Sequence, residues 1–266
     1  MFLSYYGLDK DLFKKEISNK EAYESRNYKE MMSRLEYIKE IKGIGLFIGE
    51  HGIGKTYTLR CFKEKTNKEL YKIIYISVGN LTVFEFLNVI SKELGLDTGN
   101  CYRNEMESNI QREIKRMINN HKDIILILDN AQNLSRDMIQ ELKFLYDFDM
   151  DSIDYVSIII CGSSEIEDEL KKKRYEHIKQ RIILKYQLKP LTREECREYI
   201  ETRLKLSGQS KMIYTESAIN ALYNISKGNI RILNNIIKTT LIVGYQQRKE
   251  IIDEEIIRIA KEEVEI

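Results

Sequence analysis

One octapeptide constrains the fold of this 266-residue chain more than any other feature of its sequence. Residues 49–56 read Gly-Glu-His-Gly-Ile-Gly-Lys-Thr and match the pattern GxxxxGK[ST] in full. A run of strand type precedes the octapeptide, and a helical pattern follows it. Glycines let such a loop wrap its backbone N–H groups around an anion at a helix N-terminus. The pattern predicts a strand, a phosphate-binding loop and a helix, in that order, and a chance glycine turn is the alternative.

The residue type at each loop position predicts how a nucleoside triphosphate would be held. Lys55 can place a positive charge on the β- and γ-phosphates, and the Thr56 hydroxyl suits Mg²⁺. We therefore expect ATP and Mg²⁺ as ligands, with Lys55 as a catalytic residue. His51 occupies a variable position, where a solvent-facing spacer is the simpler interpretation. The expected ATP-binding residues of this segment are Gly49, Glu50, His51, Gly52, Ile53, Gly54, Lys55, Thr56 and Tyr57.

A second signal is the apolar run 124–129, which ends in Asp129. An aspartate that closes a buried strand after such a loop suits a Walker B carboxylate, which would hold Mg²⁺ through water while Thr56 offers its hydroxyl to the metal. The next residue is Asn130. ATPases with these two Walker motifs normally have a glutamate at this position, and its carboxylate polarises the attacking water. An amide can orient a water but cannot accept its proton, and a general base contributes about 10²- to 10⁴-fold. We therefore predict intact ATP binding and slow turnover, with Asp129 and Asn130 both in the catalytic site.

Runs rich in β-branched residues alternate with helical patterns as far as residue 188. The runs are 45–48, 73–78, 124–129, 156–161 and 182–188. The third and fourth are largely apolar, as expected for strands buried on both faces, and Cys161 reads as a core residue. Between runs, apolar residues at 106, 110, 114 and 117 share one helix face. This alternation predicts an α/β fold with a parallel sheet between helical layers.

The pattern changes after Pro190, the single proline of the chain. Thr192 and Glu195 read as a capping box that opens a helix, and Gly208 ends that helix after Leu206. Three further helical patterns follow near 216–226, 229–247 and 253–265. We therefore expect three parts, which are an aromatic-bearing helical extension over 1–25, an α/β ATP-binding domain over 26–189 and a helical domain over 190–266.

Composition narrows the class of protein. The formal net charge is +1, so contact with nucleic acid would need a local patch rather than a bulk field. We see no apolar segment of about 18 residues and no signal peptide, and we expect a cytoplasmic protein. The four cysteines are far apart and form no CxxC pair, which favours reduced thiols over a zinc site.

With both Walker segments placed, the chain resembles an AAA+ ATPase of the ExeA-like branch, which includes transposon-associated regulators of the TnsC/TniB/MuB type. The resemblance spans most of the chain. It is carried by Tyr5–Leu8, Met31–Tyr37, the Asp-Asn-Ala-Gln segment 129–132, Gln180–Arg181, the Leu-Lys-Pro-Leu-Thr segment 188–192 and the Gly-Asn-Ile-Arg segment 228–231.

This resemblance implies a P-loop AAA+ core with a five-stranded parallel sheet, a C-terminal helical lid and nucleotide at a subunit interface. Arg231 falls on the sensor 2 position, which would make it an ATP-binding and catalytic residue at the γ-phosphate. Arg181 falls near the arginine-finger position and would stabilise phosphate charge in a neighbouring subunit. An ordinary surface arginine is the alternative for both. Ser163 lies in the sensor 1 region, but its Gly-Ser-Ser-Glu context departs from the branch and leaves that assignment open.

The resemblance also implies partners, namely further copies of this chain in a ring or helical filament, duplex DNA, and a transposase or other transposon-encoded protein. Candidate DNA contacts are Thr82, Arg103, Arg112, Lys115 and Arg116, for which a solvated helix face is the alternative. The basic run 171–174 follows acidic residues 167–169 at helical spacing, so a salt-bridged surface is the simpler interpretation there.

Three hypotheses remain open from the sequence. The first is a motor or switch enzyme that hydrolyses ATP to leave DNA or to reset target choice. The second is an ATP-locked DNA scaffold with negligible hydrolysis, which Asn130 favours. The third is an ATPase of a secretion or membrane complex. Secretion proteins of this branch carry a membrane span and an envelope-facing domain that we do not find here, which favours the transposon-associated type.

Overall fold

The computed structural model describes residues 2–11, 13–14, 17–97, 99, 101–148 and 154–264 of the chain. The chain divides into two compact units. Residues 30–50 and 55–188 form the α/β unit, and residues 1–29, 51–54 and 189–266 form the helical unit. The tip of the glycine-rich loop, 51–54, thus clusters with the helical unit.

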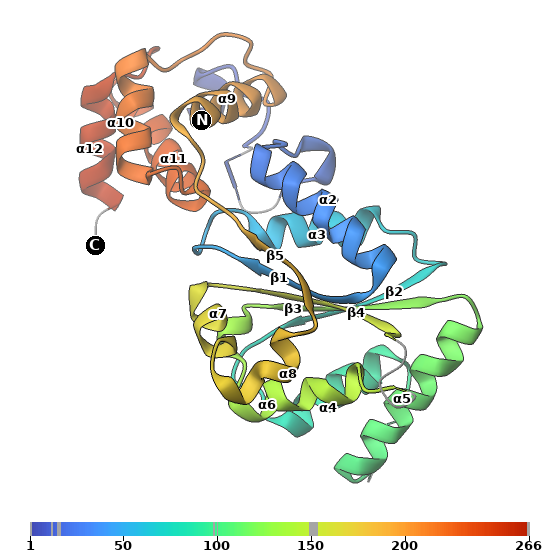
Figure 1. Cartoon of the computed structure of the whole chain (residues 1–266). Helices are drawn as coiled ribbons and strands as arrows, with labels where there is room; N and C mark the ends of the chain where they lie inside the picture. Colours follow the sequence, from blue (N-terminus) through green and yellow to red (C-terminus); the bar gives the residue numbers. More distant parts are fainter. Residues whose placement is uncertain are drawn as a thin grey trace. The chain divides into compact units, whose positions relative to one another are not determined.

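The α/β unit is built on a five-stranded sheet with the order β2-β3-β4-β1-β5 (Figure 1). Every strand pair is parallel. The strands are β1 Gly43–Ile48, β2 Tyr71–Ser77, β3 Asp123–Asp129, β4 Val156–Gly162 and β5 Ile182–Gln187. Each predicted β-branched run overlaps one of these strands, which confirms the predicted α/β fold.

Burial along each strand follows its place in the sheet. All positions of the central strands β1 and β4 are buried, and β3 is buried from its second residue onward. The edge strand β5 instead alternates between half-buried and exposed positions. Strands covered on both faces need apolar side chains at successive positions, which explains why the sequence reads as near-continuous isoleucine and leucine in β3 and β4.

Helices cover both faces of the sheet in the α/β unit. Figure 1 shows α2 and α3 over one face and α4, α5, α6 and α8 over the other. Residues 106, 110 and 114 of α5 are fully buried and 117 packs partly buried against the same core, as predicted. The helices are α2 Arg26–Ile41, α3 Lys55–Lys65, α4 Val83–Glu93, α5 Arg103–Asn119, α6 Arg136–Glu141, α7 Ser164–Leu170 and α8 Glu176–Lys179, with 3₁₀ turns η2 Ala131–Asn133, η3 Leu142–Leu145 and η4 Lys173–Tyr175.

The helical unit has its own hydrophobic core. Its helices are α1 Phe2–Tyr5, α9 Arg193–Leu206, α10 Glu216–Ser226, α11 Ile230–Gln246 and α12 Glu254–Val264, with the 3₁₀ turn η1 Asn19–Glu21. Thr192 and Glu195 form the predicted capping box at the start of α9, and the three later helices lie where their periodicity predicts.

The N-terminal extension differs from the helical segment expected over 1–25. Among its described residues, only α1 and η1 are helical. Tyr6, Leu8 and Phe13 are instead buried in the core of the helical unit, and the Tyr6 hydroxyl donates a hydrogen bond to the Lys249 carbonyl at 2.9 Å. Packing of separate aromatic side chains, rather than helical periodicity, therefore orders this segment.

No helix in the described part of the chain has the length and apolar character needed to cross a membrane. The four cysteines are free thiols, of which Cys61, Cys161 and Cys196 are buried and Cys101 is half-buried. Cys161 lies in β4 with no exposed surface, as predicted for a core residue.

Candidate nucleotide-binding site

The carboxyl ends of the parallel strands bring the site residues to one edge of the sheet. The glycine-rich loop follows β1, Ser77 ends β2, Asp129 ends β3 and Gly162 ends β4. Ligands of open α/β sheets bind outside the carboxyl ends of the strands. The topology therefore places both Walker segments at the edge where a ligand is expected.

Lys55 opens α3 and folds back over the loop that precedes it. Its side chain is 8% exposed, and its Nζ donates hydrogen bonds to the carbonyls of Gly49 at 2.6 Å and Glu50 at 2.7 Å. The first turn of α3 contains no acidic residue, so the positive end of the helix dipole is not neutralised there. This combination of an ammonium group, a helix N-terminus and a loop rich in N–H groups is suited to phosphate.

Two glycines of the loop tip have backbone angles that other residues rarely adopt. Gly52 has φ +87° and Gly54 has φ +102°. The Gly52 carbonyl accepts a hydrogen bond from the Arg231 N–H at 3.1 Å, and Asn229 Nδ2 donates to the His51 carbonyl at 2.7 Å. A Cβ on Gly52 would lie 2.5 Å from Asn229 Oδ1, so this position requires glycine for both conformation and space.

Asp129 is the acceptor at the centre of the site. The carboxylate is fully buried. Its Oδ2 accepts hydrogen bonds from Thr56 Oγ1 at 2.6 Å and from the Tyr75 hydroxyl at 2.9 Å, while its Oδ1 accepts from the Asn130 N–H at 2.9 Å. Thr56 and Asp129, which are far apart in sequence, thus bring two oxygen atoms together. Mg²⁺ prefers such hard oxygen donors, so these two residues fit the metal predicted from the sequence.

Asn130 adopts the left-handed conformation, with φ 55° and ψ 40°. Asparagine tolerates this region better than most residues. Its Nδ2 donates a hydrogen bond to Ser77 Oγ at 3.1 Å. The amide is therefore tied to the end of β2, and it contains no basic oxygen that could take a proton from water.

Gln132 joins the turn after β3 to the end of β4. Its Oε1 accepts a hydrogen bond from the Ser163 N–H at 3.2 Å. A Cβ on Gly162 would come within 2.9 Å of the same oxygen, so glycine permits this approach. Ser163 Oγ in turn donates to Glu165 at 3.1 Å.

Sequence reasoning missed Tyr75, Ser77 and Gln132. Tyr75 and Ser77 share one face of β2 because side chains alternate along a strand. The signal that could have identified Tyr75 is a hydroxyl-bearing aromatic in an isoleucine-rich strand, since a tyrosine in such a setting needs a hydrogen-bond partner. The identity of that partner depends on the pairing of Ser77 with Asp129, which the structure supplies.

Arg181 lies just before β5, at the amino edge of the sheet. Its guanidinium donates a hydrogen bond to Asp154 at 3.3 Å and lies 4.5 Å from the ring centroid of Tyr146. In a parallel sheet this edge is opposite the one that bears the glycine-rich loop, so Arg181 is not brought to the site of its own α/β unit. A role in a neighbouring subunit stays a prediction.

Arg231 lies in the first turn of α11, for which Asn229 is the N-cap. Its backbone N–H binds the loop tip within the helical unit, and its side chain is exposed. No hydrogen bond or ion pair of that guanidinium occurs among the described residues. Contact of Arg231 with a γ-phosphate stays a prediction.

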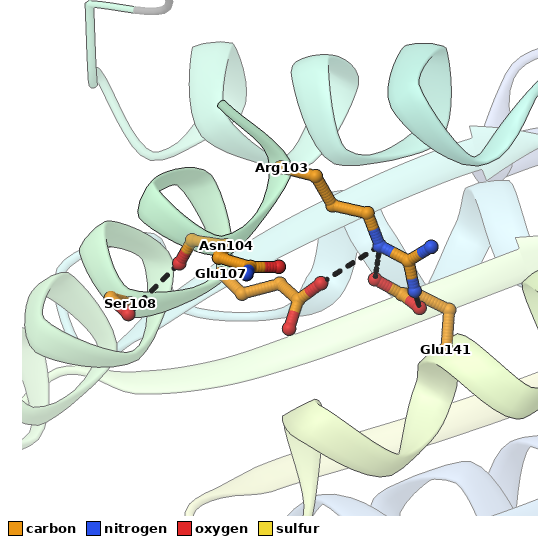
Figure 2. Close-up of polar contacts among 5 residues, drawn as sticks. All are labelled: Arg103, Asn104, Glu107, Ser108 and Glu141. Carbon is orange, nitrogen blue, oxygen red and sulfur yellow. Dashed lines mark hydrogen bonds and ion pairs between the residues drawn. The ribbon is translucent and has the colours of Figure 1, made fainter. Parts of the chain in front are cut away.

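The candidate DNA contacts all have partners within the chain. Figure 2 shows Arg103 between Glu107, at 3.0 Å, and Glu141, which pairs with the same guanidinium. The other four are also engaged. Thr82 caps α4, Arg112 donates to Asn109 at 3.2 Å, Lys115 Nζ lies 5.9 Å from the Phe148 ring centroid, and Arg116 forms a bidentate pair with Glu113.

Three residues of the basic run 171–174 form ion pairs with the acidic residues 167–169, as the sequence pattern predicts. Lys171 pairs with Glu167 at 3.1 Å and Asp168 at 2.9 Å, and Lys172 and Arg174 both pair with Glu169. Among these pairs, only Lys171–Glu167 has the predicted spacing of four residues. Exposed ion pairs of this kind contribute little to the free energy of unfolding. Their main effect here is to neutralise the charges of these lysine and arginine side chains.

Glu141 provides a pH-dependent test of the network in Figure 2. Burial, reinforced by the neighbouring Glu107, raises the pKa of this 6%-exposed carboxyl from 4.5 to about 7, although Arg103 opposes the shift. The folded state then holds a proton that the unfolded state releases, so the free energy of unfolding falls as the pH rises from 4.5 to about 7.

We expect the melting temperature of Glu141→Gln to depend less on pH between 4.5 and about 7 than that of wild type. The exposed Glu69→Gln is the control, and parallel curves for all three proteins would contradict the prediction.

The sequence of this chain is similar to that of a known protein family and of a characterised protein. Residues 38–170 match the family described as AAA domain. The chain is 26% identical over 255 residues to General secretion pathway protein A of Aeromonas hydrophila, and this match covers 92% of the chain but only 45% of that protein. The chain therefore spans less than half the length of this relative.

Solved structures share the fold. Cdc6p from Pyrobaculum aerophilum has a TM-score of 0.70 at 17% identity, with 98% of this chain and 71% of that chain covered. The ORC1 protein of Aeropyrum pernix, solved in complex with DNA, has a TM-score of 0.65 at 16% identity and covers 98% and 69% of the two chains. These similarities confirm the predicted P-loop α/β architecture with a helical C-terminal part.

Proposed function

This chain belongs to the AAA domain family, and from that premise we propose that it binds ATP with Mg²⁺ and uses the nucleotide to control its assembly on duplex DNA. The observation that carries the proposal is the meeting of Thr56 and Asp129 at 2.6 Å beside the glycine-rich loop. A hydroxyl and a carboxylate in that position match the magnesium site of a nucleoside triphosphate.

Each residue has a distinct task in this proposal. Loop N–H groups and the start of α3 hold the phosphates, and Lys55 exchanges the Gly49 and Glu50 carbonyls for phosphate oxygens. Thr56 and Asp129 hold the metal, which when bound neutralises phosphate charge. Arg231 contacts the γ-phosphate, and Arg181 reaches the nucleotide of a neighbouring subunit.

Hydrolysis in this proposal is slow because Asn130 replaces the usual glutamate. The asparagine is held by Ser77 and can orient a water without deprotonating it. A long-lived ATP state would keep subunits assembled. This property supports a switch or scaffold rather than a fast motor.

The DNA part of the proposal rests on two kinds of support. The ORC1 protein, which is similar in fold, was solved in complex with DNA. The second support is the resemblance of sequence segments such as 129–132 and 228–231 to those of transposon-associated regulators. We therefore propose that the assembled protein recruits or activates a transposase, with duplex DNA bound by the basic residues of α5. Many subunits along one duplex can share the phosphate contacts, so a net charge of +1 is compatible with binding.

Electron microscopy of the protein with duplex DNA tests this function. We expect regular assemblies on DNA with ATP and Mg²⁺ and isolated particles with ADP, because the γ-phosphate decides whether subunits join. Sedimentation of the same mixtures gives the bound fraction in solution. Equal assembly with ATP, with ADP and without nucleotide would rule out the nucleotide switch.

A second candidate function is that of an ATPase in a secretion complex. The 26% identity to General secretion pathway protein A over 92% of the chain favours it. This alternative keeps the nucleotide site and removes DNA as a partner. ATP-dependent self-assembly that is indifferent to added duplex would support it against the DNA-bound regulator.

A further inference from the structure

Tyr75 makes a polar contact with the site, although it belongs to neither of the two Walker motifs. It lies in β2, the edge strand next to β3, and its hydroxyl donates a hydrogen bond to Asp129 Oδ2 at 2.9 Å. The same oxygen accepts the Thr56 hydroxyl at 2.6 Å. Tyr75 thus reaches the one carboxylate oxygen that the Walker A threonine also uses.

Asp129 depends on such neutral donors. The carboxylate is fully buried. It accepts hydrogen bonds from Thr56, Tyr75 and the Asn130 backbone. A buried carboxylate is stabilised and oriented by its hydrogen bonds, so the loss of one of these matters.

The Tyr75 ring is placed independently of its hydroxyl, because the ring is half-buried in β2 and lies 5.8 Å from Lys63 Nζ of α3. Removal of the hydroxyl alone should therefore leave the ring in place.

We propose that Tyr75 is a positioning residue for the metal site, whose hydroxyl fixes Asp129 Oδ2 toward Thr56 so that the two oxygens can hold a divalent cation together. This inference rests on the proposed binding of ATP with Mg²⁺. Thr56 approaches from the first turn of α3 and Tyr75 from the edge strand β2, and together they leave the carboxylate little freedom to rotate.

The test compares Tyr75→Phe with wild type in binding of a fluorescent ATP analogue, with excess Mg²⁺ and with EDTA. We expect the affinity of the variant to fall about tenfold in Mg²⁺, as for loss of a hydrogen bond to a charged group, and to be unchanged in EDTA. Tyr71→Phe is the matched control, since Tyr71 lies on the same face of β2 four residues earlier, and it should bind like wild type.

The outcomes separate the two proposals. If wild type shows no gain in affinity from Mg²⁺, the proposed function fails. If wild type gains affinity and Tyr75→Phe gains it equally, or if the variant is weakened equally in EDTA, the inference about Tyr75 fails while the proposed function stands.

A second measurement covers the case in which Tyr75→Phe does not fold. With 3-fluorotyrosine incorporated at position 75, the ring and hydroxyl remain and the ¹⁹F resonance reports the hydrogen bond to Asp129. We expect the resonance to move on addition of Mg²⁺ to the ATP-bound protein. A resonance that does not respond to Mg²⁺, while the affinity for ATP does, would overturn the positioning role.

Discussion

Replacement of Lys55 by alanine is expected to lower the affinity for ATP by about 100-fold or more, which corresponds to one strong charged hydrogen-bonded contact. The ammonium group is 8% exposed and donates to two loop carbonyls, so it is already held at the place where the phosphates would lie. No other side chain of the octapeptide is expected to replace it, because residues 49–56 contain no second lysine or arginine. Equilibrium binding of a fluorescent ATP analogue measures the loss.

Lys65→Ala is the matched control, since Lys65 is exposed at the other end of the same helix. It should bind ATP like wild type and assemble normally. Thermal unfolding of both variants shows whether the fold is kept. Full nucleotide affinity and unchanged assembly in a folded Lys55→Ala protein would remove the basis of the proposed function.

Replacement of Asn130 by glutamate is expected to raise kcat for ATP hydrolysis by at least about 100-fold, the lower end of the roughly 10²- to 10⁴-fold contribution of a general base. The carboxylate would lie next to Ser77, where the asparagine amide now lies. Position 130 has φ 55°, and residues other than glycine and asparagine lose about 1–2 kcal/mol in this conformation. We therefore also expect a lower melting temperature. Steady-state phosphate release and thermal unfolding check the two effects.

Asn130→Gln separates the charge from the length of the side chain. The glutamine variant has the same backbone strain at position 130 and the same number of non-hydrogen side-chain atoms as the glutamate variant, but it has no basic oxygen. Its kcat should stay near that of wild type. A rate for Asn130→Glu equal to that of wild type would show that the asparagine does not limit hydrolysis.

Local sequence patterns predicted most helices and strands because burial along a strand and capping of a helix depend on residues that are close in sequence. The isoleucine-rich runs predicted β3 and β4, whose side chains are buried on both faces of the sheet. Thr192 predicted the start of α9, where its hydroxyl oxygen accepts a hydrogen bond from the Glu195 N–H. The order of the strands is a different matter. β4 lies between β1 and β3, and that placement depends on crossover connections rather than on any one segment.

The candidate site was predictable only in part for the same reason. Thr56 and Asp129 carry motifs, so their meeting could be expected before the structure. Tyr75 belongs to no motif, and its contact with Asp129 follows from the pairing of β2 with β3. Among the charged residues, the Arg103–Glu107 pair follows from helical spacing, whereas Glu141 comes from a separate helix and was not predicted.

The edge position of β2 has a consequence for how this site can be tuned. β2 pairs with one neighbour in the sheet, whereas β1, β3 and β4 each pair with two. The groups that hold Asp129 and Asn130 in place, Tyr75 and Ser77, thus come from an edge strand of the sheet. We expect substitutions in β2 to change how long the proposed nucleotide stays bound, while the strands that carry the Walker residues keep their packing.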